Sequence, residues 1–137
     1  MTNASVERFK QLTKDLQVEV HNQAVAELHN QANDLKNTIK ALAPVYHGTQ
    51  VIGTHPGALK ESVRAIPDRS KDTIVRVVAG DATTVMDGFN YARAVEFGTQ
   101  KMAAEAFFFP TYRLMKKKMI AAMKRKITAS IKARSAE

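Results

Sequence analysis

The chain has 137 residues, a formal net charge of +8 and no cysteine. This length fits one domain with its own hydrophobic core, so we treat 1–137 as a single domain. Hydrophobic residues make up 45% of the chain and charged residues 25%, a balance that excludes a largely disordered protein. Without cysteine the chain forms neither a disulfide framework nor a thiolate metal site.

The N-terminal residues carry charge where a secretion signal is apolar. Glu7, Arg8 and Lys10 occupy the positions at which a signal peptide needs a hydrophobic run. No window of the sequence reaches the apolar length of a membrane span. We therefore expect a soluble protein that has no cleaved leader and no membrane contact.

Apolar residues recur at three- and four-residue spacings over 5–42, which predicts one long helix that ends before Pro44. In the second half of this helix they form a narrow stripe, and such a stripe packs on one neighbour. That neighbour belongs either to the same chain or to another subunit. The candidate subunit contacts on this stripe are Leu28, Leu35 and Leu42.

The middle of the chain, 44–99, mixes short elements. Turn residues indicate loop over 43–56, with a short strand at 49–52, and residues 56–65 predict a two-turn helix that points Leu59, Val63 and Ile66 inward. The β-branched run 73–79 predicts a strand.

Three further elements complete the prediction. Residues 83–86 are expected to pair with the strand at 73–79 as a hairpin, and residues 91–97 predict a short helix stopped by Gly98. After a loop at 99–105, Pro110 is suited to the first turn of a last helix, 110–133. This helix carries an apolar stripe of Met115, Met119, Met123, Ile127 and Ile131.

Catalytic chemistry is not indicated. His21 and His29 are more than two helical turns apart, so they do not form a close ligand pair, and His47 and His55 lie in a loop without cysteine partners. Asp81 and Asp87 sit in Gly-Asp and Asp-Gly pairs, which are typical of turns. We expect neither an enzyme, nor a cofactor, nor a metal site.

The excess positive charge lies in the last helix. Between Tyr112 and Glu137 there are nine basic residues and one acidic residue, whereas the rest of the chain is balanced. Residues on the side opposite the apolar stripe form either a solvated face or contacts to DNA phosphates or an acidic protein surface. These candidates are Lys117, Lys118, Lys124, Arg125 and Lys132.

Phe107, Phe108 and Phe109 form the densest aromatic run. Three adjacent rings are compatible with stacking on single-stranded nucleic acid. We favour the alternative, in which two rings anchor the last helix to the core and the third meets a partner. All three are therefore candidate partner contacts.

Three sequence blocks, taken together, resemble a known family. Residues 57–63, GALKESV, are similar to its helix start TGxLrxSi, with Pro56 in place of Thr. Residues 91–99, YARAVEFGT, resemble its most recognisable block, YAxxvEfGT. Residues 107–110, FFFP, are similar to PFlrPA, with Ala106 and Thr111 as departures. The family comprises the head–tail joining or tail-completion proteins, also labelled minor tail components, of long-tailed bacteriophages and prophages, and the resemblance covers about 44–115.

The resemblance implies an α+β fold, in which a long N-terminal helix and a C-terminal helix pack on a small antiparallel sheet with short connecting helices. It implies a structural virion protein of the neck, assembled in the host cytoplasm as a homo-oligomeric ring, which we expect to be a hexamer. Its expected partners are connector or head-completion proteins, the tail tube or tail terminator, and the passing double-stranded DNA.

The family motif implies structural roles for its residues, with Glu96 capping or pairing locally and Gly98 permitting a tight turn. The matched positions are Gly57, Leu59, Tyr91, Ala92, Glu96, Phe97, Gly98 and Thr99. One alternative is a free-standing nucleic-acid-binding protein that uses the basic helix. A second is a small hydrolase that depends on Asp81, Asp87 or a histidine.

Overall fold

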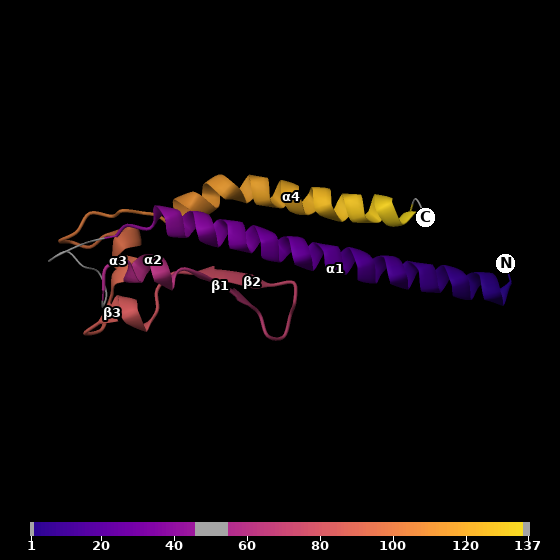
Figure 1. Cartoon of the computed structure of the whole chain (residues 1–137), viewed down its shortest axis with the longest axis horizontal. Coiled ribbons are helices and arrows are strands. Elements are labelled where there is room, and N and C mark those ends of the chain that lie inside the picture. Colours follow the sequence, from indigo (N-terminus) through magenta and orange to yellow (C-terminus); the bar gives the residue numbers. More distant parts are fainter. Residues whose placement is uncertain (1, 46–54, 136–137) are drawn as a thin grey trace.

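Two long helices, α1 (Asn3–Leu42) and α4 (Phe109–Ser135), run antiparallel and pack along each other (Figure 1). In this computed structural model, which describes residues 2–45 and 55–135, α1 also contacts the hairpin of β1 (Arg64–Pro67) and β2 (Val75–Val78). The remaining short elements lie around the C-terminal end of α1 (Figure 1). The expected α+β fold is confirmed.

Helix α1 begins two residues before the predicted start. The Thr2 hydroxyl accepts a hydrogen bond from the Ser5 backbone N–H at 3.2 Å, which satisfies one of the free amides of the first turn. The helix ends after Leu42 because Pro44 disfavours the helical conformation at the preceding residue, and Ala43 is extended. The single long helix predicted from apolar spacing is therefore confirmed.

The N-terminal part of α1 extends beyond α4 (Figure 1). The last described turn of α4 reaches the level of Asp15, where Arg134 Nη2 lies 3.9 Å from Asp15 Oδ2. Residues 3–14, called the α1 overhang below, therefore lie past the end of α4. Phe9 and Leu12 in the α1 overhang are 65% and 54% exposed.

The predicted two-turn helix over 56–65 is wrong in its second half. The helix α2 spans Ala58–Ser62 only, and the next residues form β1. Pro67 favours an extended Ile66, and pairing with β2 holds the whole segment extended. Leu59 and Val63 are buried as expected, whereas Ile66 is exposed on the strand.

The predicted hairpin between 73–79 and 83–86 is also wrong. Strand β2 pairs with β1 in antiparallel register, and residues 68–74 connect the two strands. Residues Ala82–Thr84 form a 3-10 helix, η2, because the Asp81 carboxylate accepts the Thr83 N–H at 2.8 Å and so caps it. The next strand, β3 (Val85–Met86), pairs instead with β4 (Phe89–Asn90).

The last two helices agree with the sequence prediction. Helix α3 spans Tyr91–Phe97 and stops at Gly98, and α4 begins at Phe109, one residue before Pro110. The strand predicted at 49–52 lies outside the described residues.

The hydrophobic core lies where α1, α2, α3 and the start of α4 meet. Its buried members include Leu35 and Ile39 of α1, Leu59, Val95 and Phe107. Met115 and Met119 of the predicted stripe pack against it and are partly buried. The hydrophobic core thus lies at one end of the molecule, and α1 and α4 extend from it toward the other end.

Two neighbouring positions of the apolar stripe on α1 allow a matched test of this core. Ile39 is fully buried and Leu42 is 58% exposed. Because Ile39→Ala leaves a cavity, we expect it to lower the free energy of unfolding by about 2–5 kcal/mol. Leu42→Ala should change it by about 0.5 kcal/mol or less. Urea unfolding monitored by circular dichroism measures both, and equal losses would contradict the assignment of the core.

Candidate functional site

The start of α4 is held by one carboxylate from α3. Glu96 Oε2 accepts the backbone N–H groups of Phe107 and Phe108 at 2.8 and 3.0 Å, and Oε1 accepts that of Phe109 at 2.9 Å. Glu96 is 7% exposed. A negative charge at a helix N-terminus satisfies free amides and complements the helix dipole. The local cap expected of Glu96 is therefore confirmed, and its target is the helix that begins after the loop.

The loop between α3 and α4 turns back sharply enough to make this contact. Gly98 has φ of +76°, and a Cβ placed there would lie 2.9 Å from the Ala104 backbone nitrogen. The Glu105 N–H then donates to the Val95 carbonyl at 2.8 Å, and this hydrogen bond holds the returning loop segment against α3. The tight turn expected at Gly98 is confirmed, since only glycine fits both the dihedral angle and the space.

The phenylalanine run is divided between core and surface. Phe107 is buried, Phe108 packs partly buried against the core, and Phe109 is exposed. The Phe109 ring lies 5.9 Å from the ring of Phe97, which is 63% exposed. The sequence prediction that two rings anchor the helix and one remains outside is confirmed.

These exposed rings form an apolar surface at the junction of α3 and α4. Phe89 and Phe97 line one shallow pocket, and Phe97 contacts Phe109. We call Phe89, Phe97 and Phe109 the aromatic patch. Large exposed apolar patches on a folded chain mark interaction sites.

A second hollow lies beside the aromatic patch. This groove has a volume of about 400 Å³ and runs between β2 and the Phe107–Phe109 segment. Val77 and Ala79 line one side and Ala92 and Phe97 line another. We call it the β2 groove. Most of its lining residues are apolar, and Arg93 and Glu96 supply its charged groups.

The other predicted contact residues are distributed over the chain. Leu35 is in the core, Leu28 is partly buried on α1, and Leu42 is exposed beside the core end of the helix. Of the motif positions, Leu59 and Ala92 are buried, and Gly57 has φ of +85° before α2. The predicted interface residues do not form one surface, because Leu35 and Phe107 are packed inside the chain.

The predicted basic residues are all exposed on α4. Met119 and Met123 on the opposite side of the helix are partly covered by the fold. The helix therefore presents a cationic face to solvent, defined by Lys117, Lys118, Lys124, Arg125 and Lys132.

Two of the histidines pair with carboxylates. His21 Nε2 lies 2.7 Å from Asp72 Oδ2 and links α1 to the β1–β2 turn, and His55 lies 2.7 Å from Glu61. His47 is outside the described residues. Over residues 2–45 and 55–135 the structure brings together no three side chains able to hold a metal ion.

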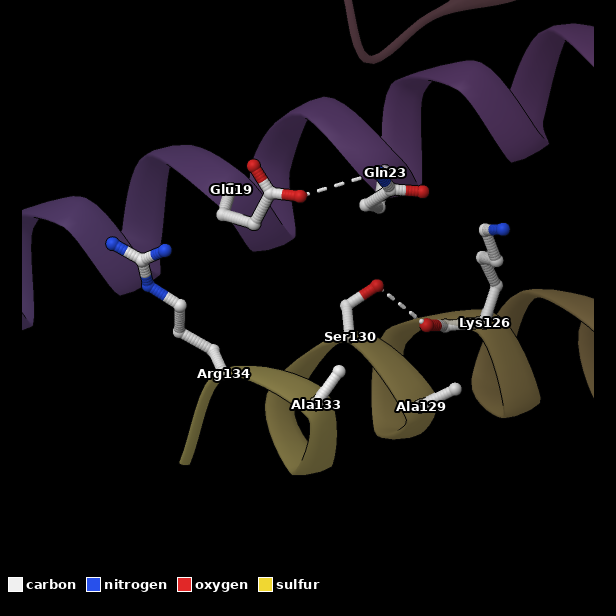
Figure 2. Close-up of a pocket in the computed structure, with 7 residues that line it drawn as sticks. All are labelled: Glu19, Gln23, Lys126, Ala129, Ser130, Ala133 and Arg134. Carbon is white, nitrogen blue, oxygen red and sulfur yellow. Dashed lines mark hydrogen bonds between the residues drawn. The ribbon is translucent and has the colours of Figure 1, made fainter. Parts of the chain in front are cut away.

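A cleft of about 410 Å³ lies between the middle of α1 and the C-terminal part of α4 (Figure 2). Small side chains of α4, Ala129 and Ala133, leave the space, and polar side chains line it. The Gln23 amide donates to Glu19 at 3.3 Å, and the Ser130 hydroxyl donates to the Lys126 carbonyl at 2.8 Å (Figure 2). These polar groups form their hydrogen bonds within their own helix. We therefore interpret the cleft as a region where the two helices pack incompletely.

Comparisons of the chain with protein-family models, with curated proteins and with solved structures each gave no match. Within the described ranges, none of the helices is both long enough and apolar enough to cross a membrane.

Sequence reasoning missed two features of the site. Phe89 received no role because its strand was not predicted, and Val77 was read only as part of a strand. Pro67, which lacks an N–H, marks residues 64–67 as a candidate edge strand, and no residue of 75–78 signals that the outer side of β2 is open. The pairing of β1 with β2 was needed before that open side could be recognised.

Replacing Glu96 tests the cap. Glu96→Ala leaves three backbone N–H groups without their acceptor, so we expect the free energy of unfolding to fall by about 2–4 kcal/mol. Glu96→Gln keeps one acceptor and should lose less. Urea unfolding measures both, with the exposed Glu105→Gln as the matched control. A Glu96→Ala protein as stable as the control would show that the cap contributes little.

Asp81 gives a pH-dependent prediction. Hydrogen bonds from Thr83, above all from its hydroxyl, hold the pKa of the Asp81 carboxyl below its ordinary value. Because the folded pKa is the lower one, this carboxylate stabilises the fold above the ordinary pKa of 3.8, and that contribution disappears as pH falls through the folded pKa.

Asp81→Ala should therefore destabilise the protein by about 1 kcal/mol near pH 7 and progressively less in acid. Thermal unfolding of both proteins at pH 7 and in acid measures the difference. A deficit that stays constant across this range would contradict the role of the ionised carboxylate.

Proposed function

We propose that the protein is a structural component of a tailed-phage virion, a ring-forming neck or tail-completion subunit that joins the DNA-filled head to the tail. The observation that carries this proposal is the aromatic patch, because it is formed at the two motifs that resemble the phage family. Phe97 lies in the YARAVEFGT block and Phe109 in the FFFP block. Both are exposed on the isolated chain.

The distribution of apolar surface supports assembly with other subunits. The aromatic patch lies at the α3 end of the molecule, and the α1 overhang, with Phe9 and Leu12, lies at the other end (Figure 1). A contact between two different surfaces of like subunits is heterologous, and it closes into a ring when the rotation between subunits permits. An elongated subunit with apolar surface at both ends suits such a contact.

The Glu96 cap supports a structural role for the most specific motif. Its carboxylate is fully engaged by three backbone amides, and Gly98 shapes the turn that brings them together. The motif residues thus build the surface that carries Phe97 and Phe109. This arrangement accords with a chain that acts through assembly, and we propose no enzymatic activity for it.

The basic face of α4 favours a second candidate, a free-standing nucleic-acid-binding protein. Lys117, Lys118 and Lys124 are exposed, and cations in such a row attract phosphate. In the neck proposal the same face meets passing DNA or an acidic protein. The free protein should then bind duplex DNA weakly. Tight binding that falls steeply as salt rises would favour the second candidate.

Deletion of the gene tests the neck proposal directly. We expect electron microscopy of the lysate to show separate DNA-filled heads and free tails, because the joint between them is missing. Intact infectious virions would overturn the proposal.

Complementation of the gene deletion with variants tests the role of the aromatic patch. Phe97→Asp with Phe109→Asp places charge in the aromatic patch, and we expect plaque formation to fall by at least about tenfold, since a buried charge costs several kcal/mol at an interface. Val18→Asp, an exposed apolar residue of α1 outside the patch, is the matched control. Both proteins should keep the parent circular dichroism spectrum. Equal plaque counts for the two variants would contradict the role of the patch.

A further inference from the structure

The hydrogen-bond pattern of the hairpin leaves one side of β2 open. The Asp68 N–H donates to the Ile74 carbonyl at 3.0 Å, so these residues form a bonded pair. Bonded and non-bonded pairs alternate along an antiparallel ladder. In the observed register Ile66 opposite Arg76 is therefore the next bonded pair. Val77, one residue further, directs its N–H and C=O away from β1.

The open side of β2 faces the β2 groove. Val77 and Ala79 both line it. The alternation places the Val77 N–H and C=O on the side away from β1, and it places those of Ala79, one residue past the paired register, on the same side. Among the described residues, no backbone hydrogen bond from a turn or loop reaches these N–H or C=O groups. A row of unpaired backbone groups is a template for another extended chain.

The opposite side of the β2 groove is apolar. Phe107, Phe108 and Phe109 line it together with Phe97, and Ala92 lies at its base. An extended chain presents side chains alternately to two sides. A segment paired with β2 would therefore direct every second side chain toward these rings, which is the pattern of recognition by strand addition.

The charged residues of the β2 groove indicate which charge a ligand should carry. Its two charged lining residues are Arg93 and Glu96. The Glu96 carboxylate is already bound by three backbone amides, whereas Arg93 is exposed and forms no ion pair with another described residue. The groove therefore offers a positive charge that a carboxylate would match.

We propose that the β2 groove binds an extended segment of a partner protein, which adds to β2 as a strand, places apolar side chains against Phe107–Phe109 and sets a carboxylate against Arg93. Strand β2 of a second copy fits less well, because its sequence VRVV brings Arg76 and no acidic residue to Arg93. The proposal does not depend on a phage role for the chain.

Amide hydrogen exchange on the full-length protein tests strand addition. The probe is the acetylated and amidated peptide TVEVTV, which alternates apolar residues and carries one carboxylate. At millimolar peptide we expect exchange at the Val77 and Ala79 amides to slow by at least about tenfold, because they gain acceptors. The amides of Arg76 and Val78 already face β1 and should change less.

A peptide N-methylated at alternate positions is the matched control, since it lacks the donors that pair with β2 and should not bind. Unchanged exchange at Val77 and Ala79, or equal binding of the N-methylated peptide, would overturn the proposal. Slowed exchange without peptide, rising with protein concentration and accompanied by a dimer in light scattering, would assign the edge to a second copy and also overturn it.

A charge exchange tests the carboxylate contact. Arg93→Glu should weaken binding of TVEVTV by about three- to tenfold, and TVKVTV should bind this variant better than it binds the parent protein. Lys101→Glu, a charge reversal outside the β2 groove, is the control and should leave the peptide affinity within about twofold. Equal losses for both variants would contradict a specific contact at Arg93. None of these outcomes alters the result of the gene deletion.

Discussion

The carboxylate of Glu96 determines how the two halves of the structure meet. It is the contact through which α3 fixes the first turn of α4, by accepting three consecutive backbone N–H groups. A buried carboxylate in water-poor surroundings needs such partners, and a helix start needs an acceptor. Each therefore satisfies the other. This interaction fixes the first turn of α4, and packing along α1 then sets the course of the helix.

The surfaces of the molecule follow from the same geometry. Once α4 starts at Phe109, the preceding Phe107 enters the core and Phe109 turns outward beside Phe97. The β2 groove is the space left between this fixed segment and the hairpin. Helix α4 then lies along α1 and ends near Asp15, which leaves the α1 overhang without cover. The cap thus positions the aromatic patch, and the greater length of α1 leaves apolar surface at the other end.

The sequence predicted the helix ends, which depend on local residues, and it failed for strand pairing, which depends on segments distant in the chain. Helix α3 was predicted to the residue because Gly98 ends it, and Pro44 ended α1 in the same way. The partner of β2 was wrong because nothing local shows that residues 64–67 become extended only when paired. The cap by Glu96 was expected, but the aromatic patch needed Phe89, whose strand the sequence did not indicate.

Pro67 makes the two outer edges of the small sheet unequal. Its ring occupies the outer side of β1 with no N–H to offer, while the outer side of β2 keeps its donors. A strand added to β2 presents an outer edge of its own, so Pro67 limits pairing only on the β1 side. Runaway edge-to-edge polymerisation is the hazard of short exposed sheets. On the β1 side, a single imino acid reduces that hazard by removing one donor from the edge.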